Sequence, residues 1–183
     1  IIIDNASTDN TIKILQKIYL KDKKVKVIVN SKNYGHIRSP FYGILQSTGD
    51  ACILMASDFQ DPIDMIQIYI KKWQEGSKIV LGKKTSSDES NISFSIRKIF
   101  YKYLNKISEM KITENTTGAG IFDKSLIERL RNINDPYPYL RGLLNEIGEN
   151  ITTVNFNQPK RLFGKKKNNF FTLYDIGMLG VVK

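Results

Sequence analysis

The residue types that are scarce in this chain exclude several functions. Its 183 residues include one cysteine, Cys52, and one histidine, His36. A single cysteine excludes a disulfide within the chain and suits a reducing compartment, and its place in an apolar run favours a small buried hydrophobe over a reactive thiol. A single histidine argues against a His-based triad and a His-rich metal site, and the residue fits a structural or solvated role better than a catalytic one. The sequence also has no run of about 18 apolar residues that could span a bilayer.

Positive charge is what the chain has in excess. It carries 28 Lys and Arg against 18 Asp and Glu, a formal net charge of +10. This excess predicts an anionic partner, which nucleic acid, a phosphorylated substrate and an anionic membrane face would all satisfy. A hydrophobic content of 41% excludes a disordered chain. The length fits one domain with a substantial core.

Apolar runs alternate with amphipathic segments through the first half of the chain. Strands are predicted at 1–3 and 25–29, in a run that ends near Met55, and at 79–81. The predicted helices between them carry Ile12 to Tyr19, Ile37 to Leu45 and Ile63 to Trp73. Strand and helix repeated in this way are typical of a parallel sheet with helices on its faces.

The second half of the chain is less regular. Its pattern predicts a polar loop over 82–91, a long amphipathic helix over 92–107, a short strand over 118–122, helices over 124–131 and 139–147, and an edge strand over 151–156. A basic loop over 158–169 precedes an aromatic helix from Phe170.

The stretch from Gly49 to Pro62 joins a buried strand to polar side chains. An apolar run ends at Met55, and Asp58, Gln60 and Asp61 follow it. Ligands collect at the carboxyl ends of buried parallel strands, so Asp58 is predicted to lie at an opening in the fold. Asp61 fits either a ligand or the cap of the next helix.

Two earlier loops also lead from a strand into a helix. Residues 4–9 read Asp-Asn-Ala-Ser-Thr-Asp, in which Ser7 and Asp9 fit helix caps. Residues 33–38 read Asn-Tyr-Gly-His-Ile-Arg, and backbone donors at such a helix start suit a phosphate. The two loops are expected at the same sheet edge as Asp58.

These segments resemble those of a known family, the GT-A glycosyltransferases that move a sugar from a nucleotide onto a polyprenyl phosphate. Residues 56–62 resemble the signature Asp-x-Asp-Leu-Gln-Asp/His-Pro-Pro-Glu, with Ala56 in place of the first acid. Residues 4–9 resemble Asp-Asp-Gly-Ser-x-Asp, and residues 33–35 resemble Asn-x-Gly. Residues 138–142 and 161–167 resemble Pro-Tyr-x-Arg-Gly and Arg-x-x-Gly-x-Ser-Lys. The segments also agree in order and spacing.

The resemblance implies an inverting glycosyltransferase similar to dolichyl- or undecaprenyl-phosphate sugar synthases. It implies the GT-A (Rossmann-like) α/β fold, with a mostly parallel sheet and helices on both faces. Asp58 would hold a divalent cation, Mg²⁺ or Mn²⁺, and would share the catalytic site with Gln60 and Asp61. Residues that would bind the nucleotide sugar are Asp4, Ser7, Asn33, Gly35 and Arg38.

The resemblance assigns the acceptor to the second half of the chain. Basic residues that would bind phosphate of the lipid or the donor are Arg141, Arg161, Lys165 and Lys167. The aromatic residues that follow predict an element at an anionic membrane surface, on its cytoplasmic face. Many relatives carry Gly-Asp-Phe where this chain has no acid, at Gly118. A hydroxyl acceptor would need a base there and a phosphate acceptor would not, which favours a lipid phosphate.

Three other functions stay open at this point. Transfer to a sugar hydroxyl in capsule or polysaccharide assembly would need a base, for which Glu114 and Asp123 are available, although each fits a surface or helix-cap role better. A nucleic-acid-binding module would use the +10 charge, although no reading-helix motif is recognisable and no nucleic-acid partner is expected. A non-catalytic relative would fit the loss of an acid at Ala56.

The boundaries suggest an excerpt of a longer protein. We expect one catalytic domain over 1–183, truncated at both ends, with a nucleotide-sugar half at 1–90, an acceptor half at 91–169 and an interfacial helix at 170–183. Residues 1–3 would then leave one side of their strand ladder unpaired.

Overall fold

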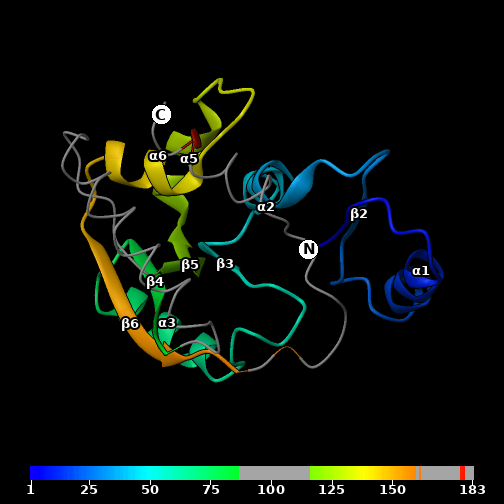
Figure 1. The fold of residues 1–183 in the computed structure, drawn as a ribbon, viewed down its shortest axis with the longest axis horizontal. Helices are drawn as coiled ribbons and strands as arrows, with labels where there is room; N and C mark the ends of the chain where they lie inside the picture. Colours follow the sequence, from blue (N-terminus) through cyan, green and yellow to red (C-terminus); the bar gives the residue numbers. More distant parts are fainter. Residues whose placement is uncertain (87–115, 160, 162–177, 180–183) are drawn as a thin grey trace.

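The computed structural model of the chain describes residues 1–86, 116–159, 161 and 178–179. Its elements, in chain order, are β1 (Ile2–Asp4), α1 (Thr11–Lys21), β2 (Val27–Val29), α2 (Gly35–Leu45), β3 (Ala51–Leu54), α3 (Met65–Gln74), β4 (Ile79–Ser86), β5 (Thr116–Asp123), α5 (Lys124–Arg131), α6 (Leu140–Glu146) and β6 (Ile151–Asn157) (Figure 1).

Most predicted elements are confirmed, and the differences have local causes. β2 begins at Val27 because the Val25 amide donates to the Asp22 carbonyl in a turn, at 3.1 Å. α3 begins at Met65, whose amide donates to the Pro62 carbonyl at 3.0 Å. The predicted loop at 82–91 is wrong over residues 82–86, which extend β4 and pair with β6. A polar strand segment is stable there because its backbone groups find partners in the neighbouring strand.

The described strands form two sheets. β1 pairs with β2, and the second sheet has the order β3-β5-β4-β6. β1 with β2 and β4 with β6 are parallel, whereas β5 is antiparallel to both β3 and β4. The predicted α/β class is confirmed, and the strands of the larger sheet run mostly in one direction, as the resemblance to GT-A proteins implies. β3, β4 and β6 run in one direction, and β5 runs against them.

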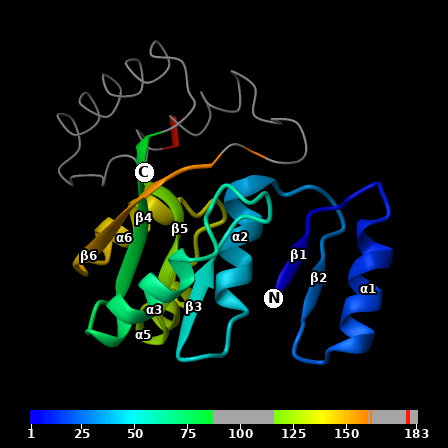
Figure 2. The ribbon, with the colours of Figure 1, turned by 90° about the horizontal axis from the view of Figure 1, so that it is seen from below.

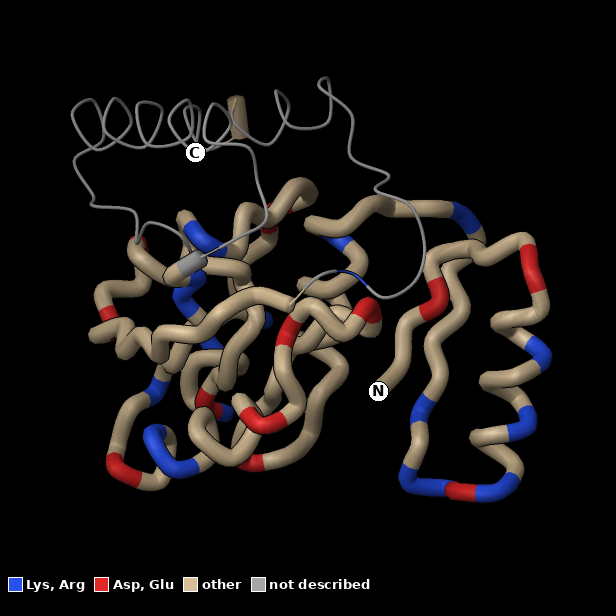
Figure 3. The backbone as a smooth tube through the Cα atoms, turned by 60° about the horizontal axis from the view of Figure 1, so that its bottom comes forward, with Lys and Arg blue, Asp and Glu red and all other residues tan. Residues whose placement is uncertain are grey.

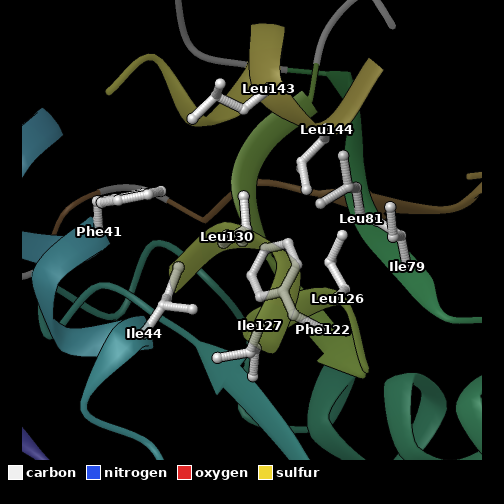
Figure 4. Close-up of a cluster of buried hydrophobic side chains, with 10 residues drawn as sticks. All are labelled: Phe41, Ile44, Ile79, Leu81, Phe122, Leu126, Ile127, Leu130, Leu143 and Leu144. Carbon is white, nitrogen blue, oxygen red and sulfur yellow. The ribbon is translucent and has the colours of Figure 1, made fainter. Parts of the chain in front are cut away.

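The four-stranded sheet carries helices on both faces. Successive residues of β4 and β5 point to opposite faces, as strand geometry requires. Ile79 and Phe122 face one cluster of buried side chains, whereas Val80 and Ile121 face the other. The first cluster packs against α2, α5 and α6 (Figure 4), and the second packs against α3 through Met65 and Tyr69. Side chains of the first cluster are Phe41, Ile44, Ile79, Leu81, Phe122, Leu126, Ile127, Leu130, Leu143 and Leu144.

α2 lies between the two groups of strands (Figure 2) and contacts both β1 and β3. Its Gly43 packs so closely on β1 that a Cβ there would overlap the Ile3 side chain. Among the described strands β1 pairs with β2 alone. Ile1 and Ile2 are 49% and 38% exposed, and no described strand pairs with the other side of β1.

Several expectations lie outside the described residues. They include the helix at 92–107, most of the basic loop at 158–169 and most of the aromatic segment from Phe170. Within the described part, no helix has the length and apolar character needed to cross a bilayer. Lys and Arg in that part are spread over several elements instead of being gathered on one (Figure 3).

Candidate active site

Strand direction brings several polar segments to one edge of the four-stranded sheet. Lys83 near the end of β4 pairs with Thr116 at the start of β5, and Ser86 pairs with Asn157 at the end of β6. The residues after β3 lie at the same edge, because β3 and β4 run in the same direction. Carboxyl ends of like-directed strands are where α/β proteins place their ligands.

Asp58, Gln60 and Arg161 meet at this edge. Arg161 Nη2 lies 2.8 Å from Asp58 Oδ2 and donates to Gln60 Oε1 at 3.2 Å. The Gln60 amide donates to Asp58 Oδ1 at 3.2 Å, which fixes the carboxylate within its own turn. The Asp58 side chain is 24% exposed. The structure thus joins the acid after β3 to a basic residue about a hundred positions later in the chain.

Asp61 is buried behind this group, with 7% exposure. Its Oδ2 accepts from the Ala56 amide at 3.3 Å, and Thr117 also donates to it. Burial raises the pKa of Asp61, and the nearby Asp58 charge raises it further, against the lowering effects of the Ala56 amide, Lys84 and Thr117. The helix-cap interpretation of Asp61 is wrong, because its carboxylate closes the 56–61 turn and α3 begins later, at Met65.

The raised pKa of Asp61 predicts that the fold becomes less stable as the pH rises. Asp61 ionises at about pH 4 in the unfolded chain and at a higher pH in the folded chain. Its ionisation therefore lowers the free energy of unfolding progressively above about pH 4. Replacing Asp61 with Asn removes the titration. Thermal melts should show the melting temperature of the variant rising relative to wild type between pH 4 and pH 7. A constant difference over that range would contradict the assignment.

The loops after β1 and β2 are joined through Asn5. Its Oδ1 accepts from Asn30 Nδ2 at 3.0 Å and from the Tyr34 amide at 2.9 Å. Its Nδ2 donates to Asn33 Oδ1 at 2.8 Å and to the Gly35 carbonyl at 3.2 Å. Asn33 Oδ1 also accepts from the Gly35 amide, at 2.8 Å, which braces the left-handed Gly35 (φ 80°) at the start of α2. The two predicted nucleotide loops therefore form one unit.

Asp4 is buried at the end of β1, with 3% exposure. Its Oδ2 accepts from the Ser7 amide at 3.0 Å, so the carboxylate holds the turn that follows the strand. The Ser7 side chain is exposed and forms no cap of α1, whereas Asp9 Oδ1 accepts from the Thr11 amide at 2.9 Å. Asp9 thus binds the first amide of α1 from the position before the N-cap, which is Asn10, and Ser7 makes no such bond.

Arg38 and Arg141 bring positive charge to the start of α2, close to His36. The Arg38 guanidinium lies 5.6 Å from the Tyr34 ring centre and 4.7 Å from that of Tyr137. Burial lowers the pKa of His36, and the nearby Arg141 charge lowers it further. Neutral imidazole is thus favoured at pH 7. Arg38 from the predicted donor half and Arg141 from the predicted acceptor half therefore lie in one neighbourhood.

Asp123 lies at the opposite edge of the sheet, because it pairs with Ala51 at the start of β3. Its Oδ1 accepts from the Ser125 amide at 2.9 Å as the cap of α5, and its Oδ2 accepts from Trp73 Nε1 at 2.8 Å. Burial opposes ionisation of Asp123, but the bonds from Ser125 and Trp73 outweigh it and lower the pKa. The favoured interpretation of Asp123 as a helix cap is confirmed, and its place at the opposite edge does not suit a base that would act beside Asp58.

This structural role can be measured. Asp123→Ala removes a helix cap and the partner of the Trp73 N–H, so we expect it to lower the free energy of unfolding by about 1–2 kcal/mol. Any turnover by the folded variant should stay within about twofold of wild type, because Asp123 and Asp58 lie at opposite edges of the sheet. Urea unfolding and saturating kinetics test both parts, and a turnover loss above tenfold in a folded variant would revive the base role.

Asp58 and Gln60 present oxygen ligands of the kind that Mg²⁺ and Mn²⁺ prefer, and Mg²⁺ is commonly held by one or two carboxylates together with substrate phosphates. No cluster of three or more His, Cys, Asp or Glu suited to a metal occurs among the described residues. The donor set thus fits a cation that shares its coordination with a substrate. Cys52 is half-buried and burial raises its pKa, as expected for an inert thiol.

The structure also shows site residues that the sequence did not reveal. Lys84 and Thr117 act on Asp61 from β4 and β5. Asn5 organises both early loops, and its place between Asp4 and Ser7 in the motif was the available signal. Three residues of interest, Glu114, Lys165 and Lys167, lie outside the described residues.

Comparison of the sequence with known proteins shows a family to which it is similar. The family described as Glycosyl transferase family 2 matches residues 1–131. The chain is 29% identical over 182 residues to a prophage bactoprenol glucosyl transferase homolog of Escherichia coli (strain K12), covering 99% of the chain and 60% of that protein. Identity and coverage are the same for the bactoprenol glucosyl transferase of Shigella phage SfX.

A third relative is YkcC of Bacillus subtilis (strain 168), an uncharacterized glycosyltransferase. It is 27% identical over 180 residues, covering 98% of the chain and 56% of that protein. The chain thus spans somewhat over half the length of these relatives.

Proposed function

The chain belongs to glycosyl transferase family 2, and from this premise we propose that it transfers a sugar from a nucleotide-sugar donor to a polyprenyl phosphate. One structural observation carries the proposal, namely the contact of Arg161 with Asp58 and Gln60. It joins the two segments that the sequence associates with the donor and the phosphate. The similarity over 99% of the chain to proteins named bactoprenol glucosyl transferases supports a polyprenyl phosphate as acceptor.

The donor would lie along the loops that follow β1, β2 and β3. We assign the nucleotide sugar to Asp4 and Ser7 and to the start of α2 at Asn33, Gly35 and Arg38. The Asn5 hydrogen bonds support this assignment because they hold the first two loops in one arrangement before any ligand binds. Such preorganisation lowers the entropy cost of binding.

Asp58 would hold a divalent cation, Mg²⁺ or Mn²⁺, with Gln60 beside it. A bound cation offsets the negative charge that develops on a departing nucleoside diphosphate. Arg161 contributes a second positive charge at the same place. This charge would also offset the charge of the departing diphosphate, which matters because the cation site has Ala56 in place of one acid. Asp61 orients the turn that carries Asp58 and Gln60, and in this proposal it would also contact the sugar.

The reaction consists of one displacement at the anomeric carbon. An oxygen of the acceptor phosphate forms the new bond to carbon from the face opposite the nucleotide, and the bond to the diphosphate oxygen breaks, which inverts the configuration. The bonding electrons leave with the nucleoside diphosphate. A phosphate acceptor is already anionic at neutral pH, so the step requires no general base. The exclusion of Asp123 from this edge agrees with such an acceptor and weakens the alternative of transfer to a sugar hydroxyl.

The acceptor assignments extend the proposal to the second half of the chain. Arg141, Arg161, Lys165 and Lys167 would bind phosphate, and the segment from residue 170 would lie on the cytoplasmic face of an anionic membrane. The division into a nucleotide-sugar half at 1–90 and an acceptor half at 91–169 is part of the same proposal.

Ligand-induced stabilisation tests the proposal directly. A ligand that binds only the folded state raises the melting temperature by mass action. Melts with a panel of nucleoside diphosphates and their sugars, with and without Mn²⁺, should show stabilisation by one nucleotide class that increases with Mn²⁺. Undecaprenyl phosphate in detergent should add to it, whereas the uncharged alcohol undecaprenol should not. Stabilisation by neither nucleotide nor lipid phosphate would contradict the proposed function.

A further inference from the structure

Arg38 differs from the other arginines whose contacts the structure defines. Arg129 pairs with Glu149, Arg131 pairs with Glu128, and Arg161 pairs with Asp58. Arg38 is half-buried, and its Nε is fully buried with no hydrogen-bond partner in the part of the chain that the structure describes. A buried donor of a charged group that has no acceptor costs free energy. The Nη groups of Arg38 form no hydrogen bond in the described part of the chain either, so a ligand that supplies acceptors to them would stabilise the guanidinium.

The contacts that Arg38 does make are with aromatic rings. Its Cζ lies 4.7 Å from the centre of the Tyr137 ring and 5.6 Å from that of the Tyr34 ring. A guanidinium held against aromatic rings keeps its in-plane N–H groups available, because the π-face contact uses none of them. The two tyrosines therefore hold the guanidinium in place and leave its N–H donors without acceptors.

The two tyrosines come from different parts of the chain. Tyr34 ends the loop before α2, and Tyr137 lies in the segment that leads into α6. Tyr137 is 45% exposed, and its amide donates to Asp135 Oδ1 at 2.8 Å, which fixes the turn that presents the ring. Arg38 thus lies at the junction of the proposed donor and acceptor halves.

Charged residues near Arg38 include Arg141 and one carboxylate, Asp135, whose Oδ1 accepts from the Tyr137 amide. Arg141 in the first turn of α6 is close enough to His36 to act on its protonation. The first turn of α2 contains no acidic residue, and no described carboxylate forms an ion pair with Arg38. An anion with several acceptor oxygens suits such a neighbourhood, since the guanidinium fork matches phosphate geometry.

We propose that Arg38 is a phosphate-binding residue at the junction of the two halves and that Tyr137 is the positioning residue that orients its guanidinium. This inference rests on the proposed function for the identity of the anion. The phosphate belongs to the donor diphosphate or to the acceptor lipid, and both present the same oxygens. Tyr137 lies outside the family-like Pro-Tyr-x-Arg-Gly segment at 138–142, so the sequence did not single it out.

Binding of small phosphate probes tests the inference without a turnover assay. Isothermal titration calorimetry with inorganic pyrophosphate represents the donor, and titration with farnesyl phosphate below its micelle concentration represents the acceptor. Arg38→Lys keeps the positive charge and removes the planar set of guanidinium N–H donors. It should therefore weaken the binding of pyrophosphate or of farnesyl phosphate by about 10- to 100-fold. Arg129→Lys is the matched control, because Arg129 pairs with Glu149 away from this site, and it should bind as wild type does.

Tyr137 supplies the second variant, in case Arg38→Lys does not fold. Tyr137→Phe keeps the ring and should leave binding unchanged, whereas Tyr137→Ala should weaken it by about 3- to 10-fold through loss of the cation–π contact. Weakening for pyrophosphate alone assigns Arg38 to the donor, and weakening for farnesyl phosphate alone assigns it to the acceptor.

Two results would overturn the inference. One is wild-type affinity for both probes in folded Arg38→Lys or, where that variant does not fold, in Tyr137→Ala. The other is the absence of measurable binding of either probe by the wild-type protein. Failure of the proposed function would give a different result. A protein that transfers no sugar but still binds phosphate through Arg38 would contradict the proposed function and support the phosphate site.

Discussion

Replacing Asp58 with Asn is expected to reduce sugar transfer by about 100- to 1,000-fold, the range seen when one preorganised electrostatic group is removed from an active site. Asn keeps the size of the side chain and can still accept from the Gln60 amide, so the 56–61 turn should persist. The negative charge that faces Arg161 is lost, and with it the proposed cation ligand. The loss should fall on the rate constant for turnover more than on the stability of the fold.

A nearby carboxylate provides the control. Asp64 is exposed and makes no cap hydrogen bond to α3, so Asp64→Asn should transfer sugar within about twofold of wild type. Both variants should melt within a few degrees of wild type. If Asp58→Asn turns over as fast as Asp64→Asn in a radiolabelled-sugar assay, Asp58 has no central role in the reaction.

The second large effect is expected at Gly120, in the centre of the four-stranded sheet. Gly120 pairs with Leu54 of β3 and with Leu81 of β4. A Cβ at this position would overlap the Val80 backbone oxygen and press on Leu81. Because a backbone oxygen inside a paired strand cannot move aside as a side chain can, Gly120→Ala should lower the free energy of unfolding by about 3 kcal/mol or more.

Gly49→Ala is the matched substitution. Gly49 lies in the turn before β3, and the nearest atom to a Cβ there is the Ala51 oxygen at 3.3 Å. Urea unfolding should show a midpoint near that of wild type for Gly49→Ala and a much lower midpoint, or no folded state, for Gly120→Ala. Equal midpoints for the two variants would mean that the close approach of β5 and β4 does not limit stability.

The class of fold could be predicted from local pattern because helices and buried strands leave distinct periods in the sequence. Leu126, Ile127 and Leu130 recur at helical spacing, and they are the residues of α5 that are buried. The reversed direction of β5 could not be predicted, since an apolar run reads alike in both directions. That direction carries functional consequences, because it places Thr117 beside Asp61 and Asp123 at the opposite edge.

Only the part of the site that depends on local sequence pattern was predictable. Asp58 could be identified because it follows a buried run, which is a local feature of the sequence. The contact with Arg161 depends on pairing between β4 and β6, and the stack of Arg38 on Tyr137 depends on the packing of α2 beside α6. Contacts of this kind join residues about a hundred positions apart, so periodicity and composition do not reveal them. The strand character of residues 82–86 was hidden for a related reason, because polar residues there are paired by the neighbouring strand.

The most direct test of the account is the identity of the acceptor. The protein should be incubated with a labelled nucleotide sugar, Mn²⁺ and either undecaprenyl phosphate or undecaprenol, and the lipid products should be extracted and analysed by mass spectrometry and NMR. The account predicts a sugar linked through a single phosphate to the polyprenyl chain, with the anomeric configuration inverted and no product from undecaprenol. Transfer to undecaprenol or to a sugar hydroxyl, with none to undecaprenyl phosphate, would contradict it.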